Sequence, residues 1–119
     1  KNGLDWERTG LTAIDFADNG EHALARPSVL INENKYYMWF SHKGSDYDLG
    51  ENYRLGFAHS EDGFNWKRED KKVKLDLGEN DFDNKMICYQ YVFKYKNKYY
   101  SLYNGNDFGK DGIGLAKLI

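Results

Sequence analysis

The chain has 119 residues, which suits one small domain, and its 17 basic and 19 acidic residues give a formal net charge of −2. The basic residues form no block, and no apolar run reaches the roughly 18 residues of a membrane span, so neither nucleic acid nor a membrane is expected as a partner. Aromatic residues make up 17% of the chain, and such a content favours strands.

The chain opens with the polar stretch KNGLDWERTG, which has no Met and no signal-peptide pattern. We therefore expect a piece of a longer protein. The single cysteine, Cys88, cannot form an internal disulfide, and this fits a reducing, cytoplasmic compartment.

The strand signals follow one another along the chain. Residues 1–8 are expected to form a last, outer strand, either of a preceding blade or as a closing strand. Residues 25–70 predict a complete four-stranded unit and residues 86–119 three strands of a second unit. The strands of the complete unit are RPSVLI, KYYMWFSH, YRLGFAHS and NWKRED. No convincing 3.6-residue periodicity is present, so little helix is expected.

The two units resemble each other in sequence. The stretch NKYY at 34–37 recurs 63 positions later at 97–100, and LGFA at 55–58 matches IGLA at 113–116. GLDWER at 3–8 matches GFNWKR at 63–68. A repeat of about 60 residues built from hairpin-joined strands is typical of a propeller blade. The sequence therefore predicts an all-β chain with two consecutive four-stranded antiparallel blades of a β-propeller.

Two blades cannot close a ring, and open sheet edges invite pairing. The chain is then either a fragment that packs against the rest of a propeller or a unit that self-associates through its exposed blade flanks. A third alternative is that residues 1–8 complete the last blade.

Several stretches carry a resemblance to a known family: ARPSVL, KYYMWFSHKG, YRLGFAHSEDGFNWKRED, MICYQYVF and YYSLYNGNDFGKDGIGLAKL. They resemble the C-terminal part of five-bladed β-propeller proteins of the glycoside hydrolase family 43 and family 32 type. The resemblance implies a complete domain of more than twice this length, with carbohydrate in a central funnel. It also implies three catalytic carboxylates on the first three blades, outside a chain that holds the last two.

The loops that join successive blades share one rim of a propeller with the loops between second and third strands, here 42–53 and 104–111. Arg26 begins an inner strand on that rim and is a candidate for binding a sugar hydroxyl or a carboxylate. Its alternative role is a structural salt bridge to Glu21 or Asp83. Tyr89 occupies the aligned position in the second unit and offers a ring face for a pyranose, or simply core packing.

Four further polar residues are candidates on the same rim. Glu21 and Asp83 are weak candidates for catalytic carboxyls, since glycoside hydrolysis usually needs a pair, and the alternative is that both are solvated. His42 and Asn104 end the two second strands, allowing for an offset of one residue, and are candidates for substrate binding. No metal site or cofactor is expected, because the spacing of the His and Cys residues and of the glycines fits neither.

The sequence thus predicts part of a glycoside hydrolase-like propeller that acts on or binds poly- or oligosaccharide. Whether it is an enzyme is left open, with glycosidase activity of the intact protein favoured. The alternative is a non-catalytic carbohydrate-binding or protein-interaction module, because fold alone does not determine function.

Overall fold

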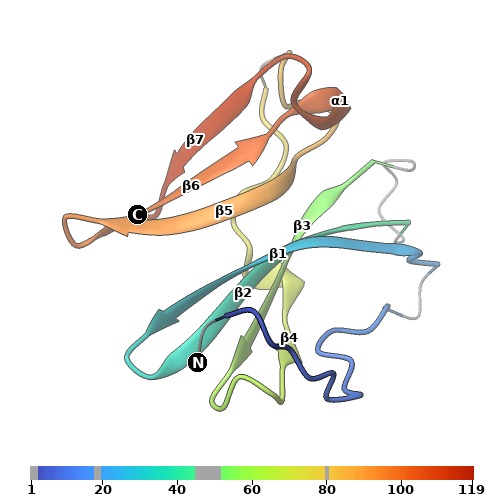
Figure 1. Ribbon diagram of the computed structural model, residues 1–119. Helices are drawn as coiled ribbons and strands as arrows, with labels where there is room; N and C mark the ends of the chain where they lie inside the picture. The colour runs from blue at the N-terminus through green and yellow to red at the C-terminus, as the bar shows by residue number, and fades with distance from the viewer. Residues whose placement is uncertain (1–2, 18–19, 45–51, 80) are drawn as a thin grey trace.

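The computed structural model describes residues 3–17, 20–44, 52–79 and 81–119. This part of the chain is all-β, with two antiparallel sheets and almost no helix, as the sequence predicts (Figure 1). The first sheet comprises β1 (Ala23–Asn32), β2 (Lys35–Lys43), β3 (Arg54–Ser60) and β4 (Lys67–Arg68), paired in that order. The second comprises β5 (Cys88–Tyr95), β6 (Lys98–Asn104) and β7 (Ile113–Lys117). Two short segments, η1 (Asp70–Lys72) and α1 (Asn106–Gly109), are helical in hydrogen bonding.

The hairpins β1–β2 and β5–β6 have the same register. Ile31 pairs with Tyr36, and Lys94, 63 positions after Ile31, pairs with Tyr99. Both turns have two residues with positive φ, namely Glu33 and Asn34 in the first and Lys96 and Asn97 in the second. Two positive φ values at the centre of a two-residue turn match the twist of antiparallel strands, which explains why Asn recurs there.

Each first strand also has a bulge near its start. The register of β1 shifts between Ala25 and Ser28, and that of β5 shifts between Cys88 and Tyr91. A bulge bends a strand and redirects the side chains within it. The bulges in β1 and β5 therefore change the direction of side chains at the same end of the two sheets.

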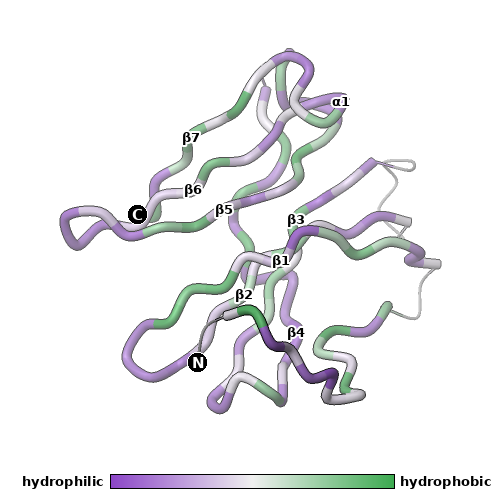
Figure 2. The backbone as a smooth tube through the Cα atoms, viewed as in Figure 1, coloured by the Kyte–Doolittle hydropathy of each residue, from purple (hydrophilic) through white to green (hydrophobic). Residues whose placement is uncertain are grey.

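The core has two hydrophobic clusters, one on each face of the first sheet. Met38, Phe40 and Ala58 form the first, against which Ile14, Leu24 and Trp66 pack. Leu55, Ile87 and Tyr103 form the second, which lies between the sheets and takes in the linker residues Val73, Leu75 and Leu77. Figure 2 shows apolar segments on strands of both sheets. Period-two alternation along β2 and β3 thus gives each face of the first sheet its own core.

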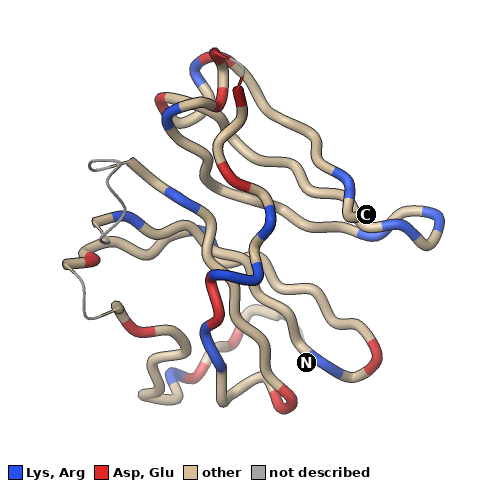
Figure 3. The backbone as a smooth tube through the Cα atoms, turned by 180° about the vertical axis from the view of Figure 1, so that it is seen from behind, with Lys and Arg blue, Asp and Glu red and all other residues tan. Residues whose placement is uncertain are grey.

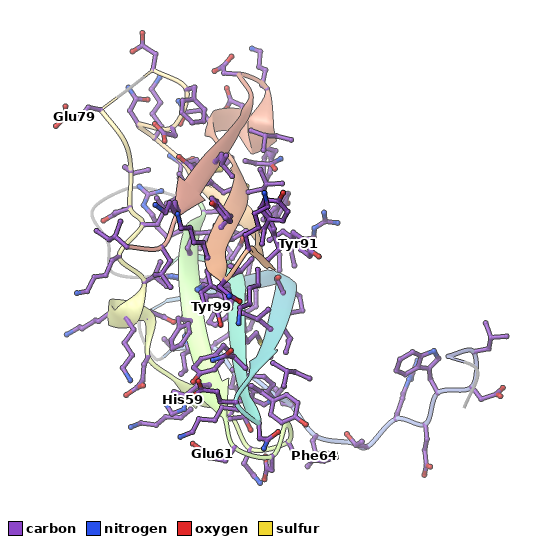
Figure 4. All side chains as sticks on the ribbon, turned by 90° about the vertical axis from the view of Figure 1, so that its left-hand side faces the viewer. His59, Glu61, Phe64, Glu79, Tyr91 and Tyr99 are labelled. Carbon is purple, nitrogen blue, oxygen red and sulfur yellow. The ribbon has the colours of Figure 1, made fainter. Side chains whose placement is uncertain are left out.

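Hydrogen bonds join the two sheets between β5 and β2 and between β6 and β1. The Tyr89 N–H donates to Ser41 Oγ at 2.7 Å, and the Tyr99 hydroxyl donates to Asn32 Oδ1 at 2.7 Å. Figure 4 shows Tyr99 where the two sheets meet. The Tyr89–Ser41 bond fixes the start of β5 relative to β2, at the end of the sheets where Arg26 and Tyr89 lie. The Tyr99–Asn32 bond joins the sheets at their other end.

Residues 3–8 form no strand in the described chain, and Trp6 is 86% exposed. The N-terminal segment extends away from both sheets in Figure 4. Residues 1–2 of the expected first strand and residues 45–51 of the expected rim loop lie outside the described residues. β4 is also shorter than the sequence predicts, because the chain turns into η1 directly after Arg68.

Candidate functional site

Arg26 and Tyr89 come together at the bulged ends of β1 and β5. Both have positive φ, 54° and 59°, which is uncommon for residues other than glycine. The Cζ atom of Arg26 lies 5.4 Å from the centre of the Tyr89 ring, within the range of a cation–π interaction. Two left-handed backbone positions at one place are the kind of strain that collects at functional sites.

Three aromatic rings, those of Tyr53, Tyr89 and Phe108, are in mutual contact. The Tyr89 ring centre lies 6.0 Å from those of both Tyr53 and Phe108, and these two are 5.9 Å apart. Lys43 places its Nζ atom 5.5 Å from the centre of the Tyr53 ring. We call these five residues, Arg26, Lys43, Tyr53, Tyr89 and Phe108, the rim cluster. They come from β1, β2, the segment before β3, β5 and α1.

Asn104 positions one ring of the rim cluster. Its Nδ2 donates a hydrogen bond to the backbone oxygen of Phe108 at 2.7 Å. α1 is not a regular helix, because Asp107 and Phe108 have left-handed backbone angles of φ 50° and 60°. The Asn104 bond holds this unusual turn, and the Phe108 side chain stays 55% exposed. Asn104 therefore acts on the cluster through Phe108.

Glu21 and His42 lie together in a different place, on the face of the first sheet that carries Met38 and Phe40. Arg68 donates to both Glu21 carboxylate oxygens at 2.6 and 2.7 Å, and the Ala17 N–H donates to Oε2 at 3.0 Å. His42 Nδ1 is 2.9 Å from Glu21 Oε1. The side chains of Glu21 and His42 are 0% and 2% exposed. The two residues belong to a buried charge network and not to an open rim.

The network sets the protonation of its members. Burial alone would raise the pKa of Glu21, but the hydrogen bonds from Arg68 and Ala17 outweigh it and lower that pKa. Burial lowers the pKa of His42 below its ordinary 6.5, against the attraction of Asp70 and Glu21. Glu21 is thus held charged and His42 neutral at pH 7. A general acid of a glycosidase instead needs a raised carboxyl pKa.

Asp83 is buried in the loop before β5. Its Oδ2 accepts a hydrogen bond from the Tyr103 hydroxyl at 2.8 Å, and burial together with this bond raises the pKa of Tyr103 to about 12. Gly78 lies so close that a Cβ there would be 2.2 Å from Asp83 Oδ1. Asn106 anchors the same loop by accepting from the backbone N–H groups of Lys85 and Met86 at 2.9 Å. Asp83 therefore holds the loop against β6.

The structure thus brings Arg26, Tyr89 and, through Phe108, Asn104 together, and places Glu21, His42 and Asp83 in buried contacts elsewhere. The register explains the separation of His42 from Asn104. Asn104 pairs with Cys88 in the way that Ser41 pairs with Ala25, so His42 lies one residue further along. One residue along a strand reverses the face, so His42 lies on the opposite face of its sheet from Ser41, the residue equivalent to Asn104. The alternative role of Arg26, a salt bridge to Glu21 or Asp83, is not formed.

Sequence reasoning missed Lys43, Tyr53 and Phe108. The sequence pattern places Tyr53 in a strand and Phe108 in a glycine-rich turn, and no local feature marks either as part of a site. The available signal was position: all three lie within the loop ranges 42–53 and 104–111 that the repeat places on one rim.

A cavity of about 470 Å³ lies between the sheets and is separate from the rim cluster. Its lining is mostly apolar and includes Trp39, Phe57, Leu75, Val92 and Tyr100. None of the six predicted site residues lines it. It is a gap between the two packed sheets.

The described residues offer neither a metal site nor a membrane-spanning helix. No group of three His, Cys, Asp or Glu side chains there could hold a metal ion. No helix in that part of the molecule is long and apolar enough to cross a bilayer. Figure 3 shows both basic and acidic residues distributed along the described backbone.

No family model matches the chain. Two proteins of Mycobacterium tuberculosis, "Uncharacterized protein MT1551" of strain CDC 1551 and "Uncharacterized protein Rv1502" of strain H37Rv, are each 33% identical over 118 residues. The match covers 99% of this chain but only 38% of either relative, so the chain spans well under half of their length.

Two solved structures share the arrangement of the sheets. One, described as "Glycoside hydrolase", has a TM-score of 0.70 and 18% identity over 94% of this chain and 31% of its own length. The other, from a complex described by the names BT0996 and RGII, has a TM-score of 0.65 and 16% identity, over 89% of this chain and 35% of its own length. At these identities the likeness concerns the fold: this chain has the fold of about a third of each neighbour.

Proposed function

We propose that the chain forms two adjoining blades of a glycoside hydrolase-like β-propeller, with residues 1–119 as one partial domain. The equal register of the two hairpins and the similarity in fold to a glycoside hydrolase support this. Residues 3–8 carry a further sign of blade structure. Trp6 Nε1 donates to the Gly3 oxygen at 3.0 Å, and Trp66 Nε1 donates to the Gly63 oxygen at 3.1 Å. Residues 3–6 thus repeat the Trp-to-Gly hydrogen bond of the turn that leads into β4.

The function proposed for this scaffold is binding of poly- or oligosaccharide at the rim cluster. The observation that carries it is the stacking of Arg26 on Tyr89, with Tyr53 and Phe108 around them. Pyranose rings have an apolar face of C–H groups and an edge of hydroxyls. Exposed aromatic faces beside fixed polar groups match both parts of such a ligand.

Turnover requires more than this surface. Hydrolysis of a glycosidic bond usually needs two carboxyls that face the bond from either side. Glu21 is paired with Arg68 and Asp83 with Tyr103, so these contacts give both carboxyls a structural role. In the proposed enzyme, the remaining blades supply the catalytic carboxylates and this chain supplies binding. The alternative is a non-catalytic carbohydrate-binding module on the same scaffold.

The test is a glycan array and a reducing-end release assay with the purified protein and its Arg26→Ala and Tyr89→Ala variants. Both variants should keep the wild-type thermal midpoint and lose at least about tenfold in affinity, which is about 1.4 kcal/mol. Phe64→Ala is the matched control. Phe64 is 62% exposed and lies in a turn at the opposite end of the first sheet (Figure 4).

If Arg26→Ala and Tyr89→Ala keep wild-type affinity, the rim cluster is not the binding site. If the two variants lose affinity and the wild-type protein shows no turnover of any substrate, the non-catalytic binding module is favoured over the enzyme.

A further inference from the structure

Two cations of the rim cluster, Arg26 and Lys43, form no ion pair with a described carboxylate. Several other cations of the described residues do form ion pairs. Arg68 is paired with Glu21 and Asp70, Lys35 with Glu61, and Lys72 with Glu69. The contacts that the structure shows for the charged groups of Arg26 and Lys43 are with the rings of Tyr89 and Tyr53. Two positive charges are therefore gathered on a protein whose formal net charge is −2.

The stacking of Arg26 leaves its donors available. The guanidinium meets the Tyr89 ring in a cation–π contact, with Cζ 5.4 Å from the ring centre, and such a contact uses no protein acceptor for its N–H groups. No described residue accepts a hydrogen bond from this side chain. The planar guanidinium suits a carboxylate, which accepts two parallel hydrogen bonds. Lys43 adds a second positive charge at the neighbouring ring.

Phe108 supplies the apolar part of the surface. Its ring is more than half exposed, and Asn104 holds its backbone in place. A neutral sugar would use this ring and leave the two cations without a carboxylate partner among the described residues. A small anion would use the cations and leave the ring bare. A sugar ring that carries a carboxylate uses both.

We infer that the ligand of the rim cluster is an acidic oligosaccharide, whose uronic-acid carboxylate is bound by Arg26 and Lys43 while a sugar ring packs on Phe108. This inference rests on the carbohydrate binding proposed above and names the class of sugar.

The experiment is isothermal titration of the purified protein with tetramers of galacturonate, glucuronate and mannuronate. Each is paired with its carboxyl-reduced, neutral counterpart. Tetraglutamate serves as an acidic ligand without sugar rings. We expect at least one uronate tetramer to bind at least about tenfold more tightly than its neutral counterpart and than tetraglutamate. That preference should shrink as salt rises from about 0.05 to 0.5 M, since the cations are near the surface.

The variants assign the effect to residues. Arg26→Gln and Lys43→Gln should each lower uronate affinity about tenfold and change affinity for the neutral tetramers little. Arg26→Lys should fall between wild type and Arg26→Gln, because it keeps the charge and loses the planar donor edge. Lys96→Gln is the control, since Lys96 stacks on Tyr95 at 5.3 Å in the hairpin at the other end of the sheet.

The outcomes distinguish the acidic ligand from carbohydrate binding in general. Equal binding of uronate and neutral tetramers, lost in Tyr89→Ala, overturns the acidic ligand and leaves the proposed carbohydrate binding standing. Tetraglutamate binding as tightly as the uronates overturns the assignment to sugar. No binding of any tetramer contradicts both proposals.

Discussion

Arg68 donates two hydrogen bonds to Glu21 and so ties the last strand of the first sheet to the loop before its first strand. The pair spans 47 positions of sequence. Arg68 also bonds Asp70 at 2.7 Å, and its guanidinium lies 5.0 Å from the centre of the Phe40 ring. The network therefore stabilises the sheet on the face opposite the second sheet.

Removal of Arg68 should be costly. Arg68→Met leaves the fully buried Glu21 carboxylate without its cation, and breaking such a pair typically costs about 3–5 kcal/mol. Since Arg68 is 18% exposed, we expect about 3 kcal/mol in urea unfolding. The control is Lys67→Met. Lys67 pairs with Glu69 but is 71% exposed, and its loss should cost less than about 1 kcal/mol. Equal effects of the two substitutions would show that the buried network is unimportant.

The buried His42 predicts a pH dependence of stability. Its pKa is lowered in the folded state, so below pH 6.5 the unfolded protein binds a proton that the folded protein resists. The free energy of unfolding should therefore fall as the pH drops from about 7.5 to about 5.5. His42→Gln should flatten this part of the curve. Parallel curves for wild type and variant, measured by urea unfolding, would contradict the burial of a neutral His42.

The Asn104–Phe108 bond predicts an effect on binding without a large effect on folding. Asn104→Ala should lower affinity for the bound oligosaccharide about tenfold, since the turn that presents Phe108 loses its anchor. Asn65→Ala is the matched control for Asn104→Ala. Asn65 Nδ2 also donates one 2.7 Å hydrogen bond, to Asp62 Oδ2, but in a turn far from the rim. Affinity that falls equally in both variants would point to a general loss of stability.

Exposed apolar side chains predict self-association of the 119-residue chain. Leu4 and Trp6 are 78% and 86% exposed, and Ile113 and Leu115 on β7 are 68% and 64% exposed. In the described sheet β7 pairs only with β6, so its outer edge is open. Sedimentation should show oligomers or aggregates that grow with concentration. Leu115→Lys should reduce them, because a charge on an open edge disfavours pairing. A wild-type monomer at high micromolar concentration would refute this prediction.

The sequence predicted the strands and turns because their signals are local. Asn34 and Asn97 mark turns that need positive φ, and alternating apolar residues such as Met38 and Phe40 mark the buried face of a strand. The sequence predicted that Arg26 and Tyr89 lie close together because the two residues align in the repeat. Aligned positions in two similar hairpins lie at the same end of their sheets.

The remaining parts depend on contacts that local sequence does not encode. Glu21 is buried only because Arg68 reaches it from β4, and a surface loop carboxylate would have the same local sequence. Phe108 lies beside Tyr89 in a turn in which Asp107 and Phe108 adopt left-handed angles, and the local sequence does not mark these angles. His42 and Asn104 lie in different places because they are offset by one residue in the aligned hairpins. Successive side chains of a strand point to opposite faces of the sheet.

The central claim, that the rim cluster binds carbohydrate, is tested most directly by amide chemical-shift mapping of the protein titrated with the tightest-binding tetramer of the uronate and neutral panel. The account predicts saturable shifts at the residues of the rim cluster and at Asn104, with little change at the hairpin turn of Lys96 and Asn97. Shifts confined to residues that line the cavity between the sheets, such as Trp39 and Tyr100, would contradict it.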